Sequence, residues 1–232
     1  MPNTSTTDGV LYIVSTPIGN LQDVTLRALE VLRAVDFIAC EDTRVTAKLL
    51  ARHGIRAPTL SFHAQSERGA VERIARSISQ GAKGAYVTDS GTPGISDPGA
   101  ALVRRIVDDG GLVVPVPGPS AIHAAIAASG LAFSSYTFLG FLSNKASRRR
   151  RAMAELSPLR SVFVFYESPH RLGGFLRDGL EIFGNIPCVV AKEMTKRFER
   201  FYRGALEEVI EGIERDGVRG EYTVIFDNRE RK

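Results

Sequence analysis

The chain has 232 residues, of which 44% are hydrophobic and 24% charged, a composition typical of folded globular proteins that excludes wholesale disorder. Its formal net charge of +4 permits an anionic partner without requiring one, so the placement of the basic residues matters more than their total. No run of about 18 apolar residues occurs, and residues 1–9 lack a signal-peptide pattern, so we expect a cytoplasmic protein with no membrane partner.

Short β-branched runs alternate with helical stretches in the first half of the chain, after a loose tail at residues 1–9. We expect strands at 11–16, 36–40, 84–90 and 112–118, and helices at 24–35, 42–54, 71–80, 99–111 and 119–130. Alternation of this kind predicts a parallel sheet with right-handed crossovers.

The pattern changes in the second half. We expect strands at 138–142, 161–168, 187–194, 199–206 and 221–228, and helices at 145–156, 169–183 and 206–217. Two of these strands follow one another without a helix between them, which predicts a mixed sheet. The sequence therefore predicts two α/β domains, at residues 10–117 and 118–232.

The two cysteines indicate no special chemistry. Cys40 ends one apolar run and Cys188 begins another, so both are expected to be small buried apolar residues. They form no Cys-x-x-Cys pair, and only four histidines are scattered elsewhere, so no metal site is expected.

Three segments rich in glycine, proline and hydroxyl residues follow expected strands of the first domain. They are STPIGNLQD (15–23), TDSGTPGISDPG (88–99) and PVPGPSA (115–121). The carboxyl ends of parallel strands meet at one edge, where ligands bind in open sheets. Glycine lets backbone approach a ligand closely and proline stiffens a loop, so the three segments together predict one small-molecule pocket. The sequence contains no GxxxxGK[ST], no GxGxxG after the first strand and no GxSxG, which argues against a nucleotide triphosphatase, a dinucleotide site and a serine hydrolase.

A set of long, ordered motifs between residues 10 and 228 resembles one bacterial family. The motifs are LYIVSTPIGNLQDVTLRALEVLRAVDFIACEDTR, VTDSGTPGISDPG, VPVPGPSAIHAAIAASGL, FLGFL, FVFYESPHRL, AKEMTKRFERFYRG and GEYTVIF. They resemble the ribosomal RNA small-subunit methyltransferase I family, which has the tetrapyrrole methylase fold. The resemblance implies two α/β domains with S-adenosylmethionine in the cleft between them, and a homodimer. It also implies 2′-O-methylation of a cytidine of 16S rRNA at the decoding centre of the small ribosomal subunit.

The resemblance also implies which residues bind S-adenosylmethionine. Thr92 stands where the porphyrin-modifying branch has an aspartate, so Asp89 or Asp97 is left to supply the missing charge. Residues matching family contacts are Pro17, Ser90, Gly91, Thr92, Ile95, Ser120, Ala121, Tyr166, Met194 and Tyr222. Plain core packing is the alternative for Tyr166, Met194 and Tyr222.

Methyl transfer to a ribose hydroxyl needs in-line positioning and is helped by a base or a nearby cation. Lys192 and Glu193 end an expected strand, where neighbouring side chains face opposite ways, and Glu167 lies in FYESPHR. The candidates are therefore Glu193 or Glu167 as the base and Lys192 as the cation. The acidic pair of EDTR (41–44) is a further polar candidate, although acids at a helix start also suit the helix dipole.

A basic cluster indicates how RNA could be held. Its five cations are Lys145, Arg148, Arg149, Arg150 and Arg151. If Asn144 or Ser147 caps this helix, arginines occupy its first turn, where the dipole disfavours them. Arg151 can pair with Glu155, whereas Arg148–Arg150 have no local acid, so we expect the cluster to contact RNA phosphates. A solvated basic face is the alternative. The segment 196–204 interleaves cations with aromatics, which suits base stacking or a strand core equally.

Two other functions stay open on the sequence. One is a tetrapyrrole-type or other small-molecule methylase on the same fold, against which Thr92 and the arginine cluster argue. The other is a ribosome-assembly factor that binds RNA without catalysis, against which retained cofactor binding would argue.

Overall fold

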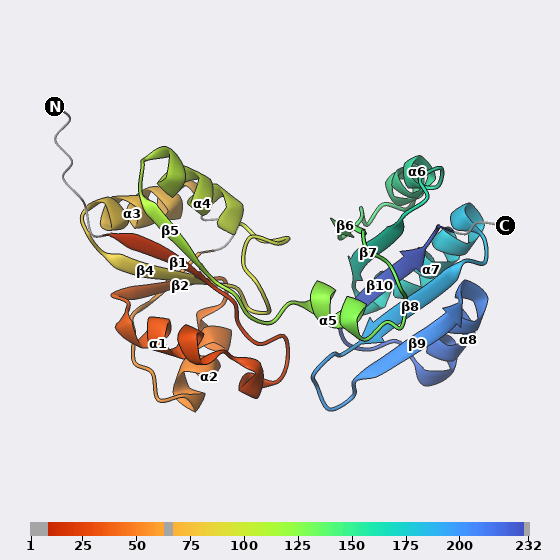
Figure 1. Cartoon of the computed structure of the whole chain (residues 1–232), viewed down its shortest axis with the longest axis horizontal. Coiled ribbons are helices and arrows are strands. Elements are labelled where there is room, and N and C mark those ends of the chain that lie inside the picture. The colour runs from red at the N-terminus through yellow and green to blue at the C-terminus, as the bar shows by residue number, and fades with distance from the viewer. Residues whose placement is uncertain (1–8, 63–66, 230–232) are drawn as a thin grey trace. The chain divides into compact units, whose positions relative to one another are not determined.

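The computed structural model describes residues 9–62 and 67–229 of the chain. It divides between Ser120 and Ala121 into two compact units, each built around one five-stranded sheet (Figure 1). The boundary expected from the sequence, between residues 117 and 118, lies in the same segment that joins β5 to α5.

The sheet of unit 1 is parallel throughout, with strand order β3-β2-β4-β1-β5. Its strands are β1 (Val10–Val14), β2 (Phe37–Cys40), β3 (Thr59–Ser61), β4 (Lys83–Val87) and β5 (Leu112–Val116). Its helices are α1 (Leu26–Ala34), α2 (Thr43–Arg52), α3 (Glu67–Ser79) and α4 (Gly99–Asp108), with a short 3-10 turn η1 (Leu21–Asp23). The predicted parallel sheet is therefore confirmed. Neither β3 nor η1 is predicted from the sequence, because three residues are too few to show a periodic pattern.

Helices cover both faces of this sheet, α1 and α2 on one side and α3 and α4 on the other (Figure 1). Successive residues of β2 serve the two layers, since Ile38 and Cys40 pack with α1 and α2 while Ala39 packs with α3 and α4. Such a strand is buried on both faces and reads as one continuous apolar run. Polar groups that need solvent or a ligand are consequently left to the strand ends.

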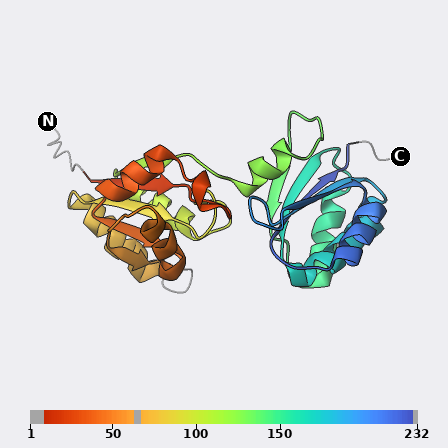
Figure 2. The ribbon, with the colours of Figure 1, turned by 90° about the horizontal axis from the view of Figure 1, so that it is seen from below.

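The sheet of unit 2 is mixed, as predicted, with order β6-β7-β10-β8-β9. Strands β6 and β7 are parallel, whereas β10 runs antiparallel to both β7 and β8, and β8 is antiparallel to β9. Its strands are β6 (Thr137–Gly140), β7 (Val162–Glu167), β8 (Pro187–Lys192), β9 (Arg200–Ala205) and β10 (Tyr222–Asp227). Its helices are α5 (Ala121–Ala127), α6 (Ala146–Leu156), α7 (Pro169–Phe183) and α8 (Leu206–Asp216). Figure 2 shows α5 on the opposite side of this sheet from α7 and α8.

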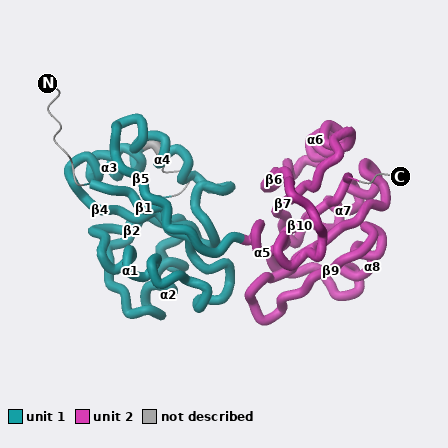
Figure 3. Tube along the Cα trace, in the orientation of Figure 1, with its two compact units in different colours: residues 1–120 teal, residues 121–232 magenta. Residues whose placement is uncertain are grey.

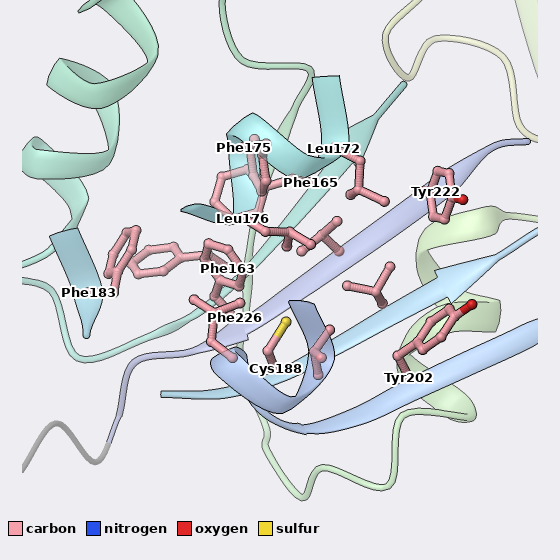
Figure 4. Close-up of a cluster of buried hydrophobic side chains, with 14 of the residues drawn as sticks. Phe163, Phe165, Leu172, Phe175, Leu176, Phe183, Cys188, Tyr202, Tyr222 and Phe226 are labelled. Carbon is pink, nitrogen blue, oxygen red and sulfur yellow. The ribbon is translucent and has the colours of Figure 1, made fainter. Parts of the chain in front are cut away.

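Phenylalanines dominate the core between this sheet and its helices (Figure 4). The rings of Phe165 and Phe175 pack edge to face with centroids 5.2 Å apart, and those of Phe183 and Phe226 lie at 5.6 Å. A Cβ on Gly179 would come within 2.7 Å of the Phe226 ring, so glycine lets α7 approach β10 closely. Cys188 lies buried in this core and Cys40 in that of unit 1, both free thiols, as predicted. Figure 3 marks the two units along the trace.

Candidate functional site

The three loops predicted to share an edge do meet at the carboxyl ends of β1, β4 and β5. The hydroxyls of Ser15 and Thr92 lie 3.0 Å apart, and Thr92 donates to the carbonyl of Pro119 at 3.0 Å. Because the single hydroxyl proton of Thr92 goes to Pro119, Ser15 is the donor toward Thr92. One side chain from the middle loop thus ties the other two together.

Backbone pairing fixes the same loops. Thr16 and Gly91 form an isolated antiparallel bridge, with N···O distances of 2.9 and 3.1 Å. Gly91 has φ of +83°, a conformation that glycine adopts without strain. A Cβ on Gly118 would lie 2.9 Å from the Cβ of Ser15, so only glycine lets the third loop come this near the first. The loops therefore form a close-packed edge with fixed main-chain groups.

The cofactor residues implied by the resemblance fall on both units. Pro17, Ser90, Gly91, Thr92, Ile95 and Ser120 lie in the three loops of unit 1, and Ala121 begins α5 of unit 2. Pro17 and Gly91 are buried, Thr92 and Ile95 are half-buried, and Ser90 is exposed. The structure thus groups the unit 1 residues at one sheet edge.

Asp97 and Asp89, the two acids considered as replacements for the aspartate absent at Thr92, differ in their bonding. The Asp97 carboxylate accepts hydrogen bonds from the Tyr86 hydroxyl at 2.9 Å and from the amides of Ile95 and Gly99 at 2.9 and 2.7 Å. These bonds commit Asp97 to the start of α4. Asp89 accepts one amide bond, from Asp42 at 3.1 Å, and burial is the main cause that raises its pKa.

Glu41 of the EDTR segment follows the end of β2 and lies in the electrostatic field of these acids. Burial raises the pKa of Glu41 to about 7, with smaller contributions from the charges of Asp89 and Asp97. Asp42, beside it, caps α2 by accepting the Arg44 amide at 2.8 Å. A positively charged ligand group beside Glu41 would favour its ionised form, because burial and the charges of Asp89 and Asp97 hold this carboxyl partly protonated at neutral pH.

In unit 2, the candidate residues line up across three neighbouring strands. Tyr222, at the start of β10, is paired in register with Glu167 at the end of β7 and with Lys192 at the end of β8. Directly opposite residues in such a ladder have Cβ atoms about 5 Å apart. Sheet topology thus unites side chains that are far apart in the sequence.

Glu167 is held tightly on the helix-covered side of this edge. Its side chain has 0% exposure, and Oε1 accepts from Arg171 at 2.6 Å and from the Ser168 amide at 2.7 Å. The other oxygen, Oε2, is buried and has no hydrogen-bond partner within the described residues. Glu167 is accordingly inaccessible to a ribose hydroxyl in this conformation.

Glu193 lies beyond β8, and its backbone has φ of +48°. The expectation that Lys192 and Glu193 alternate along one strand is therefore wrong, because the strand ends at Lys192. The Glu193 carboxylate accepts from Lys196 at 3.0 Å and from the Glu221 amide at 2.9 Å. Burial tends to raise its pKa, but these two donors outweigh burial and hold the pKa below its ordinary value. Lys192 donates to the carbonyl of Gly217 at 3.3 Å.

The aromatic and thioether candidates of unit 2 are covered to different degrees. Tyr222 and Met194 have only 3% and 8% exposure, and the Tyr222 hydroxyl donates to the Arg219 carbonyl at 2.9 Å. Tyr166 is half-buried against Phe138 and its pKa is raised to about 12 by burial. Core packing thus accounts for most of the surface of Tyr222 and Met194, while Tyr166 keeps an open part.

The basic helix α6 is only partly as predicted. The Arg151–Glu155 pair is confirmed at 3.0 Å, but Arg149 and Arg150 both bind Asp178 of α7, each through Nε at 2.7 Å. These two arginines have no acid on their own helix, as the sequence indicated, but α7 packs the carboxylates of Asp178 and Glu181 against them. Arg149 is 6% exposed and unavailable to phosphate.

The start of α6 is the part that stays open. Lys145 is the N-cap residue of α6, and its side chain makes no capping hydrogen bond. Neither Asn144 nor Ser147, the two N-cap residues considered from the sequence, takes that position. Lys145 and Arg148 are exposed, and neither forms an ion pair with any residue that the structure describes. These two cations are the ones that suit phosphate binding.

The segment 196–204 divides between the two interpretations. Tyr202 is buried and donates to Asp216 at 2.8 Å, as a core residue does. Phe198, before β9, is 68% exposed, with the Arg197 guanidinium 5.5 Å from its ring centre. Only the exposed end of the segment suits base stacking.

Residues 9–62 and 67–229 contain no group of three or more His, Cys, Asp or Glu side chains arranged to hold a metal ion. Within these same ranges, every helix is too short or too polar to cross a membrane.

Comparison with known proteins identifies the family. The profile of the Tetrapyrrole (Corrin/Porphyrin) Methylases matches residues 10–210. The chain belongs to the tetrapyrrole methylase family. The resemblance inferred from the sequence is thereby confirmed for the superfamily. It is also confirmed for the narrower group of ribosomal RNA methyltransferases within it.

Proteins named Ribosomal RNA small subunit methyltransferase I are similar to this tetrapyrrole methylase over most of their length. The one from Thermotoga maritima is 45% identical over 222 residues, covering 96% of this chain and 100% of that protein. The one from Halalkalibacterium halodurans is 42% identical over 224 residues, covering 97% of this chain and 78% of that protein.

Solved structures of more distant methylases share the fold. A cobalt precorrin-4 methyltransferase superposes with a TM-score of 0.71 at 17% identity, over 95% of this chain and 96% of its own. A uroporphyrin-III C-methyltransferase from Thermus thermophilus, complexed with S-adenyl homocysteine, gives 0.65 at 18% identity, over 95% and 98%. The predicted two-domain α/β fold is therefore confirmed.

Proposed function

We propose that this methylase transfers a methyl group from S-adenosylmethionine to the ribose 2′-hydroxyl of a cytidine in 16S rRNA, at the decoding centre of the small ribosomal subunit. The observation that carries the proposal is 40–45% identity, over nearly the whole chain, to proteins named for small-subunit ribosomal RNA methylation. The exposed cations Lys145 and Arg148 add support, since a porphyrin-sized ligand does not require them.

The residues present fit the cofactor. The three loops offer fixed main-chain groups and hydroxyls, and the carboxyl groups of Asp89 and Glu41 lie at the same edge of unit 1, where a ligand carrying a sulfonium and an ammonium group would favour their ionised forms. The residues proposed to bind S-adenosylmethionine are Pro17, Ser90, Gly91, Thr92, Ile95, Ser120, Ala121, Tyr166, Met194 and Tyr222. Asp89 supplies the charge that Thr92 lacks, because Asp97 is committed to α4. When bound, the cofactor supplies an activated methyl group.

The chain's own residues orient the hydroxyl and take its proton. Glu193 is the better candidate for the base than Glu167, because its side chain is 19% exposed whereas that of Glu167 is fully buried against Arg171. Its lowered pKa keeps Glu193 ionised at neutral pH and able to accept a hydrogen bond from the ribose. Lys192, adjacent to it, stabilises negative charge that develops on the ribose oxygen.

A labelling experiment tests the function. Radiolabelled S-adenosylmethionine is incubated with small ribosomal subunits that lack the native modification, and the labelled nucleotide is identified after digestion. We expect 2′-O-methylcytidine, and no label when the subunits already carry the modification. Cofactor binding with no transfer to any RNA would contradict the proposal and favour a small-molecule methylase or a non-catalytic assembly factor.

We further propose that the protein acts in the cytoplasm, where ribosomal subunits are found, and that it is a homodimer, as the resemblance implies.

A further inference from the structure

One aromatic side chain at the edge of unit 2 is exposed although its surroundings hold it in place. Phe141 directly follows β6 and is 55% exposed. Its ring packs against Tyr166, with centroids 5.5 Å apart and planes at 51°. The Arg171 guanidinium lies 5.9 Å from the centre of the same ring. A large apolar ring fixed on two sides and open on the rest is arranged to receive another flat group.

Arg171 is itself fixed by three contacts. Its Nη2 binds Glu167 at 2.6 Å, its Nε donates to the Ser168 hydroxyl at 3.2 Å, and its Nη1 donates to the carbonyl of Leu142 at 3.2 Å. The last bond joins the start of α7 to the residue after Phe141. The fully buried carboxylate of Glu167 is thus one of the groups that hold the Arg171 guanidinium in place.

The chemistry of the surroundings indicates what this ring binds. Lys145 and Arg148 follow Phe141 closely along the chain, and both are exposed without an acidic partner in the described residues. An apolar peptide would gain nothing from two free cations, whereas single-stranded RNA combines flat bases with a phosphate backbone. Phe141 also lies at the edge where β6 and β7 end in parallel, as does Glu167.

We propose that Phe141, backed by Tyr166 and Arg171, is a stacking platform for an unpaired base of the RNA substrate, and that Glu167 is a positioning residue that holds Arg171 beneath it. The inference rests on the proposed RNA substrate. It assigns Glu167 a role in substrate binding in place of proton transfer.

The first test compares Phe141→Ala and Phe141→Tyr with the wild-type protein. Leu159→Ala is the matched control, because Leu159 is 52% exposed and precedes β7 at its opposite end. Dissociation constants for small ribosomal subunits are measured by filter binding, together with kcat and KM for methyl transfer and the affinity for S-adenosylmethionine. Loss of one stacked base predicts about tenfold weaker RNA binding and a higher KM for Phe141→Ala, with kcat at saturating S-adenosylmethionine unchanged. Phe141→Tyr retains binding.

The second test separates positioning from proton transfer at Glu167. Glu167→Gln keeps the shape of the side chain but removes the charge that holds Arg171. We expect a raised KM for the subunit, with a kcat and a pH profile of kcat like those of the wild type. A large fall in kcat with a changed pH profile would instead make Glu167 the base and overturn its positioning role.

The results distinguish failure of the platform from failure of the proposed function. If the wild-type protein methylates the subunit and Phe141→Ala binds it as tightly as Leu159→Ala, the platform is wrong and the function stands. If the wild-type protein neither binds nor methylates the subunit, the proposed function and the platform fall together.

Discussion

Three glutamates at the strand ends of this methylase have the same functional group and different chemistry. Burial raises the pKa of Glu41 to about 7, so part of its population is protonated at neutral pH. Two hydrogen-bond donors outweigh burial at Glu193 and lower its pKa. Glu167 is closed into an ion pair. The role of each carboxylate is decided by the hydrogen-bond donors around it and by how deeply it is buried, and both depend on the fold.

Glu41 makes stability depend on pH. Its folded pKa of about 7 lies above its ordinary value of 4.5, so the folded state binds the proton more tightly than the unfolded state does. The contribution of Glu41 to the free energy of unfolding is therefore fully present below pH 4.5 and is lost as the pH rises through 7. We expect Glu41→Gln to stabilise the protein by about 1 kcal/mol at pH 8 and to have little effect at pH 5, after allowance for solvent screening of this half-buried group. Denaturant unfolding at both pH values measures this. Glu30→Gln, an exposed change on α1, is the control, and an equal effect at both pH values would disprove the assignment.

Glu193 is expected to act in the chemical step. Glu193→Gln cannot accept the ribose proton, so kcat should fall by about 100-fold while the affinity for S-adenosylmethionine stays the same. Single-turnover methylation of small subunits is the measurement, and Glu211→Gln, an exposed glutamate of α8, is the control. Because its pKa is lowered, the wild-type rate should show no loss from Glu193 protonation between pH 6 and 8. A Glu193→Gln variant with wild-type kcat would exclude Glu193 as the base.

At the scale of elements, the basic residues at the start of α6 fall into three groups. Arg149 and Arg150 face α7 and share the buried carboxylate of Asp178, whereas Lys145 and Arg148 face solvent. Arg151 pairs along the helix with Glu155, and both side chains are well exposed. Within this one basic cluster, some side chains therefore stabilise the fold, whereas others are exposed and available to a ligand.

Removal of the buried cation should destabilise the fold. Arg149→Ala leaves a carboxylate that is 5% exposed with a weakened set of partners, so we expect a loss of about 3 kcal/mol in the free energy of unfolding. Arg151→Ala, which breaks an exposed pair, should cost under about 0.5 kcal/mol. Chemical denaturation of both variants tests the distinction. Equal stabilities would mean that the Asp178 pairs contribute nothing.

Removal of the free cations should weaken RNA binding without affecting the fold. We expect the Lys145→Ala, Arg148→Ala double variant to reduce the slope of log affinity against log salt by about 1.4, since each phosphate contact on a single strand contributes about 0.7. Its unfolding free energy and cofactor affinity should match the wild type. The Lys48→Ala, Arg52→Ala variant removes the same charge from α2 of unit 1 and is the control. Identical salt slopes for the two double variants would exclude a role for the start of α6.

At the scale of the whole molecule, one chain builds two different sheets. The sheet of unit 1 is parallel and covered by helices on both faces, so its polar residues gather at the strand ends. The sheet of unit 2 is mixed, and its central strand β10 brings Tyr222 between Glu167 and Lys192. Both units thus present their candidate functional residues at a sheet edge.

The assembly state is a prediction at this scale. We expect light scattering to give about twice the chain mass of 25.2 kDa at micromolar concentration, unchanged by added S-adenosylmethionine. A mass of one chain at the same concentration would disprove the homodimer.

Much of this fold could be predicted from local pattern, and so could the converging loops. The strand at 161–168 and the helix at 169–183 were recognised because apolar periodicity and a proline at the helix start are local signals. The three-residue strand β3 could not be recognised in this way, since it is defined by its pairing with β2, which is a tertiary interaction. The partners of Arg149 and Arg150 lie 28 or more residues away, so no rule on helix spacing could find them.

The sequence by itself determined the fold class, the parallel and mixed sheets, the loops at the strand ends and the family. These follow from local signals, namely the apolar periodicity, the positions of glycine and proline, and long ordered motifs. Only the tertiary structure decided which charges are free. Burial and hydrogen bonding closed Glu167 and Arg149 into ion pairs, shifted the pKa values of Glu41 and Glu193 in opposite directions, and left Phe141 and Arg148 open. The physical reason is that solvation depends on what packs over a group, and that comes from distant parts of the chain.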